Sequence, residues 1–120
     1  MKFMLMIYAN QETWDGLSAE EMGKGIAEQD AFNTTFFETG ELISAYGLAD
    51  AATARTVRVR AGAAAVTDGP YLETKEYLAS FCLLDCQDET RALEIAARMP
   101  FAAFNAVEVW PVMHEAVPPR

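Results

Sequence analysis

Two short runs of the sequence are apolar on both sides when read as β-strands, and this feature constrains the fold most. In residues 2–9, KFMLMIYA, Met4 and Met6 point to one side and Leu5 to the other. Residues 76–86, EYLASFCLLDC, show the same pattern. A strand with two apolar faces is covered on both sides, so we expect these two runs to be the central strands of one sheet.

Two helical patterns alternate with the strands. The spacing predicts a helix over residues 19–39, because Ser18 can begin a capping box and Gly40 can end the helix. A second helix is predicted in DETRALEIAARM, capped near Asp88 and ended before Pro100.

Shorter strands complete the predicted fold. They are ELISAYG at 41–47, RTVRVR at 55–60, AAAVT at 63–67 and AVEVWPVM at 106–113, where Pro111 indicates an edge or a strand end. In residues 55–60 the valines point to one side and the arginines to a solvated side. The order matches an α+β, ferredoxin-like split β-α-β fold with an extra short hairpin strand, and the two apolar runs lie in its middle.

The helices of such a fold cover only one face of the sheet, whereas the central strands are apolar on both faces. A second copy of the chain is the simplest cover for the other face. We therefore predict a homodimer with its sheets packed face to face, which is a dimeric α/β barrel. The length of 120 residues fits one domain, expected over residues 1–116 with a disordered tail at 117–120.

The charge balance excludes some classes of partner. The chain carries a net charge of −9, with eighteen acidic residues against nine basic ones. Binding to nucleic acid or to an anionic membrane surface depends on Lys and Arg, so neither is expected. No apolar run reaches the roughly 20 residues that span a bilayer, and the first ten residues are read as a strand and not as a signal peptide.

The cysteines and histidine indicate neither a disulfide nor a metal site. Cys82 and Cys86 would lie on one face of a strand at roughly 13 Å, too far apart for a disulfide. We expect free thiols and a cytoplasmic protein. His114 is the only histidine, and we expect no metal and no cofactor.

Polar residues interrupt the apolar stripe of the long helix. Gln29, Asn33 and, at the edge, Asp30 fall between apolar residues that share one face: Met22, Ile26, Phe32, Phe36 and Phe37. A buried polar group without a hydrogen-bonding partner costs about 1–3 kcal/mol. These side chains either bond to a loop or to water, or they line a cavity between the helix and the sheet.

A cluster of ionisable residues follows a rigid turn in residues 67–81, TDGPYLETKEYLASF. Asp68 precedes Gly-Pro, and it either bonds its own backbone in the turn or contributes to a site. Lys75 either forms a weak solvated ion pair or offers a positive charge to an anionic ligand. Tyr8 is either a core residue or the source of a hydroxyl group in a pocket.

The segment DGPYLETKEYLASF is similar to the signature of the YCII-related proteins, in the branch named for its D-G-P-F motif. Tyr71 stands here in place of the phenylalanine. The resemblance extends through KFMLMIY, TVRVR and AVEVWPVM in the same order, so it covers nearly the whole chain. It implies a ferredoxin-like fold that dimerises through its sheets, with a small cleft between helix and sheet in each subunit.

Some related proteins have been proposed to be enzymes because a His–Asp pair lies in that cleft, and others are associated with alternative sigma factors. The first helix here reads EQDAFN and lacks that histidine. Asp68 matches the aspartate of the motif, and Asp30 is the nearest substitute for the histidine. If the loop folds toward the helix, two close carboxylates would raise the pKa of one of them and supply a proton donor and an acceptor.

Two functions remain open at this point. The first is an enzyme with carboxylate acid–base chemistry, in which Asp68 and Asp30 are catalytic and an unknown small molecule is the substrate. The second is a non-catalytic ligand-binding or regulatory protein, for which the resemblance suggests a link to sigma-factor-dependent transcription. In both, the ligand contacts are expected from Gln29, Asn33, Tyr8 and Lys75.

Overall fold

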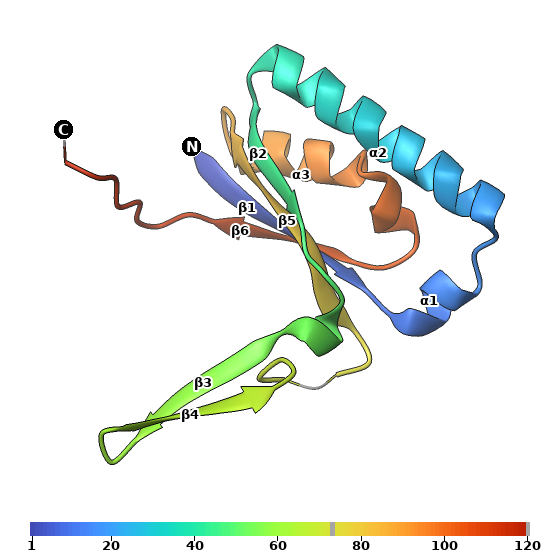
Figure 1. The fold of residues 1–120 in the computed structure, drawn as a ribbon. Helices are drawn as coiled ribbons and strands as arrows, with labels where there is room; N and C mark the ends of the chain where they lie inside the picture. Colours follow the sequence, from blue (N-terminus) through green and yellow to red (C-terminus); the bar gives the residue numbers. More distant parts are fainter. Residues whose placement is uncertain (73, 120) are drawn as a thin grey trace.

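A four-stranded antiparallel sheet forms the body of the chain in a computed structural model, which describes residues 1–72 and 74–119. The strands lie in the order β2-β5-β1-β6 (Figure 1). Their bounds are β1 Lys2–Ala9, β2 Leu42–Gly47, β5 Tyr77–Asp85 and β6 Val107–Pro111. The two strands predicted to be central, β1 and β5, are central, and the arrangement is α+β and compatible with a ferredoxin-like fold.

Helices and 3-10 turns connect these strands. They are α1 Gln11–Asp15, α2 Ala19–Thr39, α3 Glu89–Ala97, η1 Ala51–Thr53 and η2 Pro100–Ala103. The predicted bounds of α2 are confirmed: Ser18 and Glu21 form the capping box, and Gly40 ends the helix with a left-handed φ of 81°. Asp88 caps α3 by accepting a hydrogen bond from the Arg91 amide at 2.9 Å. The short helix α1 was not predicted.

The helices α2 and α3 cover one face of the sheet (Figure 1). On β1 the side chains alternate: Phe3, Leu5 and Ile7 are buried toward the helices, whereas Met4 and Met6 on the other face are only partly buried. The helices leave this second face open, as the pattern of the strand predicted. Packing of the open face against a second copy remains a prediction.

The buried stripe of α2 differs from the predicted one. Phe32 and Phe36 are buried, but Ile26 and Phe37 are 54% and 49% exposed. The stripe that faces the sheet follows positions 22, 25, 29, 32 and 36, at intervals of three and four residues. Phe37 lies about 100° around the helix from Phe36 and so points away from the sheet. Position 29 lies in the middle of this packing stripe.

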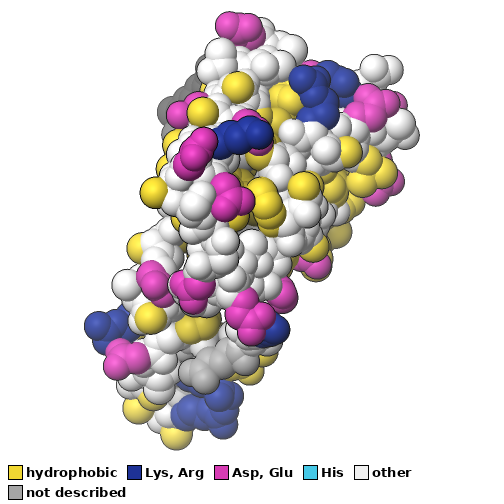
Figure 2. All heavy atoms as spheres, turned by 90° about the vertical axis from the view of Figure 1, so that its right-hand side faces the viewer, with side chains coloured by type: hydrophobic (Ala, Val, Ile, Leu, Met, Phe, Trp, Pro, Cys, Tyr) yellow, Lys and Arg dark blue, Asp and Glu magenta, His cyan; other side chains and the backbone are white. Residues whose placement is uncertain are grey.

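The predicted strands at 55–60 and 63–67 form a separate hairpin that does not join the main sheet. Strands β3 (Arg55–Arg60) and β4 (Ala63–Asp68) pair only with each other in the described residues, and Ala61 and Gly62 both have positive φ in the turn. The hairpin extends away from the helices (Figure 1). A group of basic side chains lies at the lower end of Figure 2, where the hairpin is. The valines expected on a buried side are exposed, Val57 at 62% and Val59 at 68%.

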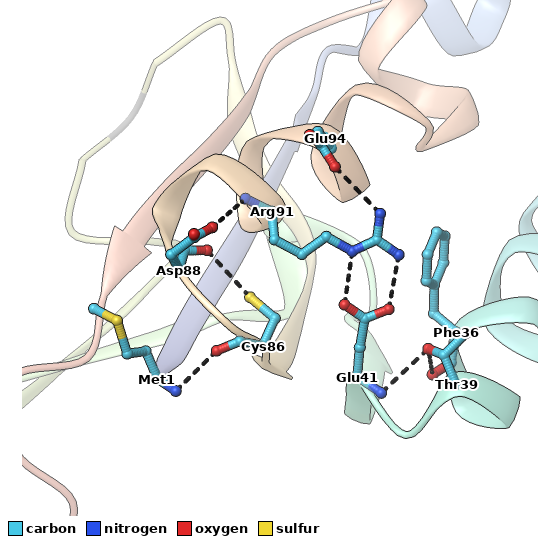
Figure 3. A network of polar contacts seen from close by, with 8 residues as sticks. All are labelled: Met1, Phe36, Thr39, Glu41, Cys86, Asp88, Arg91 and Glu94. Carbon is cyan, nitrogen blue, oxygen red and sulfur yellow. Dashed lines mark hydrogen bonds and ion pairs between the residues drawn. The ribbon is translucent and has the colours of Figure 1, made fainter.

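A polar network joins the start of β2 to α3 (Figure 3). The Arg91 guanidinium donates two hydrogen bonds to the Glu41 carboxylate, at 2.7 and 2.8 Å, and a third to Glu94 at 3.2 Å. The hydrogen bonds from Arg91 lower the pKa of the Glu41 carboxyl below its usual value. The same guanidinium lies 5.9 Å from the centre of the Phe36 ring. Arg91 of α3 therefore contacts both α2 and the start of β2 at this end of the sheet.

Two further sequence expectations concern membranes and thiols. No helix within residues 1–72 and 74–119 combines the length and the apolar character needed to cross a bilayer. Cys82 and Cys86 are both buried and form no disulfide, as predicted.

Candidate functional site

A cleft lies between the helices α1, α2 and η2 and the sheet. It has two parts, which share Ile7, Ser80 and Phe101: a part of about 160 Å³ beside α1, called the outer part, and a part of about 250 Å³ beside α2, called the inner part. The outer part is also lined by Tyr8, Ala9, Thr13, Trp14, Leu17, Ala79, Phe104 and Asn105. The inner part is also lined by Gln29, Asn33, Ala45, Gly47, Cys82 and Met99, and it borders Tyr46 and Phe81, whose side chains point to the opposite face of the sheet. The inner part lies between α2 and the sheet, where the resemblance implied a cleft.

Gln29 and Asn33 supply the polar groups of the inner part. They lie one helical turn apart, and Gln29 Nε2 donates a hydrogen bond to Asn33 Oδ1 at 3.0 Å. The other amide oxygen, Gln29 Oε1, is buried and accepts no hydrogen bond from the described residues. Of the two alternatives for the polar interruption in α2, the structure therefore favours a cavity lining. Gln29 Oε1 is therefore an unused buried acceptor on a residue that lines the cleft.

Aromatic rings form the outer part. The rings of Trp14 and Phe101 lie 5.6 Å apart, and those of Phe101 and Phe104 lie 6.2 Å apart, both in tilted arrangements. Trp14 comes from α1, whereas the two phenylalanines come from η2 and its end. Such a wall offers a large apolar contact area with few rotatable bonds, which suits a planar ligand.

The loop that follows the DGPY motif, called the motif loop, contributes a carboxylate that bonds to two side chains at the rim of the outer part. Glu76 accepts hydrogen bonds from Asn10 Nδ2 at 3.0 Å and from Asn105 Nδ2 at 2.7 Å. Asn10 also caps α1, because its Oδ1 accepts from the Thr13 amide at 2.8 Å and from the Thr13 hydroxyl at 2.9 Å. The sequence did not identify Glu76, Asn10 or Trp14 as site residues. The Asn-x-x-Thr spacing at residues 10–13 is a capping signal that could have identified α1.

Tyr8 and Lys75 lie at the margin of the cleft region. Tyr8 borders the outer part, but its hydroxyl bonds to Glu108 on the open face of the sheet and so points away from the cleft; this hydrogen bond raises the pKa of the hydroxyl above its usual value. Lys75 Nζ forms an ion pair with Glu12 of α1 at 3.0 Å, and both side chains are exposed. Lys75 therefore ties the motif loop to α1, as a weak solvated pair.

The structure does not bring Asp68 and Asp30 together. Asp68 ends β4 and forms an ion pair with Arg55 across the base of the hairpin, where its side chain is 82% exposed. Asp30 is exposed on α2, outside the stripe that faces the sheet. The expected carboxylate pair required the motif loop to fold toward α2, but the hairpin carries Asp68 away from the helices. The neighbours of Asp68 are hairpin and turn residues, including Thr56, Arg58 and Tyr71.

The cleft is electrically neutral over the described part of the chain, since none of its lining residues there is acidic or basic. Burial raises the pKa of the Cys82 thiol to about 12, so this group stays protonated and unreactive. Among the described residues, no group of three His, Cys, Asp or Glu side chains gathers closely enough to bind a metal ion. The arrangement therefore suits recognition of a neutral molecule by shape and hydrogen bonding.

Comparisons with known proteins agree with the resemblance seen in the sequence. Residues 1–116 match the YCII-related domain. The chain is also 32% identical over 96 residues to an uncharacterized protein of Rhizobium meliloti (strain 1021), an alignment that covers 80% of this chain and 77% of the relative. The match to the domain extends over nearly all of the chain, including the motif loop, the hairpin and the cleft. The protein belongs to the YCII-related family.

Proposed function

We propose that the chain binds a small neutral molecule in the cleft between α2 and the sheet, and that the ligand has an aromatic or apolar body and one N–H or O–H donor. The observation that carries this proposal is the buried Gln29 Oε1, which accepts no hydrogen bond from the described residues. An unpaired buried acceptor costs about 1–3 kcal/mol, and a ligand donor would remove that cost. The rings of Trp14 and Phe101 would hold the apolar body.

Electrostatics argue for a neutral ligand. A charged group moved from water into an apolar cleft without a counter-charge loses most of its hydration, which is costly. The described lining residues offer no counter-charge, and the rim carries the Glu76 carboxylate, which would repel an anion. Lys75, the cation once considered for an anionic ligand, is already paired with Glu12.

Ligand binding without acid–base catalysis is the function that the geometry supports best. Acid–base catalysis needs a titratable group within hydrogen-bonding reach of the substrate. Asp68 pairs with Arg55 on the hairpin, and Asp30 is exposed on α2. A ligand-responsive regulatory role, including one linked to sigma factors, is compatible with such a cleft. We also propose that the chain belongs to the DGPF-motif branch, because its loop reads DGPY.

The predicted homodimer and cytoplasmic location belong to the same proposal. The partly buried Met4 and Met6 on the open face of the sheet support sheet-to-sheet packing. The two buried free thiols are typical of a reducing compartment.

A thermal-shift experiment with simple aromatic probes tests the proposed site. Indole and phenol carry a ring and a donor, toluene lacks the donor, and benzoate is an anion. We expect indole or phenol to raise the melting temperature by mass action more than toluene, and benzoate to have no effect.

Three variants locate the binding. Gln29→Leu should remove the advantage of the donor-bearing probes, and Phe101→Ala should weaken all probes. Asp68→Asn, which alters the motif outside the cleft, should leave binding unchanged. Equal shifts for wild type and both cleft variants, or loss of binding in Asp68→Asn alone, would place the ligand elsewhere and contradict the proposal.

A further inference from the structure

A single copy of this chain exposes more surface than a folded monomer of its size. Its accessible surface is 8391 Å², whereas a monomeric protein of this mass is expected to expose about 6,400 Å². The radius of gyration is 16.6 Å, against about 13.6 Å for a 120-residue domain. The excess of roughly 2,000 Å² is comparable to the area that each subunit buries in a large homodimer interface.

The β3–β4 hairpin and the extended residues 113–119 both contribute to this exposed surface (Figure 1). Its cross-strand pairs Val57↔Val66 and Val59↔Ala64 share one face. Val57, Val59 and Val66 are 62%, 68% and 60% exposed, so this valine face is open to solvent in the single chain. A two-stranded hairpin alone is only marginally stable in water, so an uncovered apolar face of this kind indicates an interaction surface.

Hydrogen bonds at the base of the hairpin join its two strands to each other. The Gly69 amide donates to the Ala54 carbonyl at 2.7 Å, and the Thr56 hydroxyl donates to the Gly69 carbonyl at 2.8 Å. Arg55 and Asp68 pair at the same end. The hairpin is therefore held together at its base, and it extends away from the main sheet as an arm (Figure 1).

Charge indicates what this arm contacts. The hairpin contains Arg55, Arg58, Arg60 and Asp68, which give it a net charge of +2. Because the whole chain carries −9, the remainder carries −11. A basic arm and an acidic body are complementary between two copies of the same chain, and such complementarity favours encounter and correct orientation.

The open face of the main sheet offers apolar contacts for the arm. Tyr46 on β2 and Trp110 on β6 are 53% and 57% exposed. Their register places them beside Phe81 and Met4, on the face that the helices leave open. Glu108 lies on this face as well, opposite Met6, and adds a negative charge among the apolar side chains.

We propose that the hairpin is a dimerisation arm, whose valine face packs against the open sheet face of a second copy of this chain. Two-fold symmetry makes the contact reciprocal, so each copy gives one arm and receives one. The arm extends the interface of the proposed homodimer beyond the four-stranded sheet. The inference rests on that homodimer, and the variants below separate the two.

Sedimentation velocity over a dilution series measures the dimer directly. We expect wild type to be a dimer, and Val57→Ser with Val66→Ser to raise the dimer dissociation constant by about tenfold or more, or about 1.4 kcal/mol. Ala65→Ser changes the opposite face of the same hairpin and should have little effect. Arg58→Glu with Arg60→Glu should weaken the dimer most at low salt. Circular dichroism of each variant checks that the main sheet is still folded.

Each outcome bears on the proposal. A wild-type chain that is monomeric at all concentrations would overturn both the arm and the homodimer. A dimer unaffected by the valine variant would contradict the role of the hairpin in dimerisation but not the homodimer itself, and the valine face would then be a surface for another protein. Met6→Glu tests the open sheet face, on which both contacts depend: loss of the dimer would support that face as the interface, whereas an intact dimer would show that neither the partner's sheet nor its arm packs there.

Discussion

Replacing Gln29 with leucine should make the protein more stable and less able to bind its ligand. Gln29 Oε1 is a buried acceptor without a described hydrogen-bond donor, which costs about 1–3 kcal/mol. The substitution also removes the hydrogen bond from Gln29 Nε2 to Asn33, which contributes about 0.5–1.5 kcal/mol. Leucine and glutamine have similar helix propensities, so this term changes little.

The difference predicts a net gain of about 1 kcal/mol in the free energy of unfolding. For a chain of this length, that gain corresponds to a rise of about 4 °C in the melting temperature. Differential scanning calorimetry of the ligand-free protein measures the change, and urea denaturation checks it independently.

Gln11→Leu is the matched control. Gln11 Nε2 donates to Asp15 Oδ1 at 2.9 Å across one turn of α1, so this variant loses a similar side-chain bond at an exposed position. It removes no buried acceptor and should leave stability unchanged or slightly reduced. A fall in the melting temperature of Gln29→Leu would mean that Oε1 already has a donor in the free protein, and the argument for a ligand donor would fail.

Three further outcomes test other parts of the structure. The pKa of Glu41 is lower in the folded chain than the ordinary value of 4.5, so its stabilising effect is full above that pH and is lost as the pH falls below it. Wild type should therefore lose stability more steeply in acid than Glu41→Gln, and an equal slope in calorimetry would show that the pair with Arg91 contributes nothing to stability. Glu76→Gln replaces one acceptor oxygen by a donor and should lower the melting temperature by about 3 °C, measured by thermal shift; an unchanged value would show that the rim bonds contribute no stability. Gly40→Ala, at φ 81°, should destabilise the fold by about 1 kcal/mol in urea, whereas Gly23→Ala in the open middle of α2 should stabilise it by about 0.5–1 kcal/mol; the reverse order would contradict the assigned cap.

Local signals in the sequence predicted the elements well. The Ser18 cap and Gly40 gave the bounds of α2, because capping depends on residues within a few positions of each other. The apolar pattern of residues 2–9 predicted the central position of β1, because a strand with apolar residues on both faces is typical of the interior of a sheet. Gln29 and Asn33 were identified as cleft residues for a similar reason, since polar groups on an apolar stripe need an explanation.

The features that the sequence did not reveal depend on contacts between distant segments. The position of Asp68 relative to Asp30 depends on the direction in which the hairpin leaves the sheet, which no local pattern encodes. The aromatic wall combines Trp14 of α1 with Phe101 of η2, two short elements whose apolar residues look like ordinary core when read singly. Alternation in residues 55–60 indicated two different faces, but not that both would be exposed in one chain.

The hydrogen bonds of Glu76 also affect the order in which the chain folds. They join positions separated by 66 residues from Asn10 and by 29 residues from Asn105. Closing such long loops has an entropic cost, and two side-chain hydrogen bonds are too weak to offset it before β1 and β5 are paired. The entrance to the cleft should therefore form after the sheet and open before it. Local unfolding at this rim would then give the proposed ligand a route in and out that leaves the core intact.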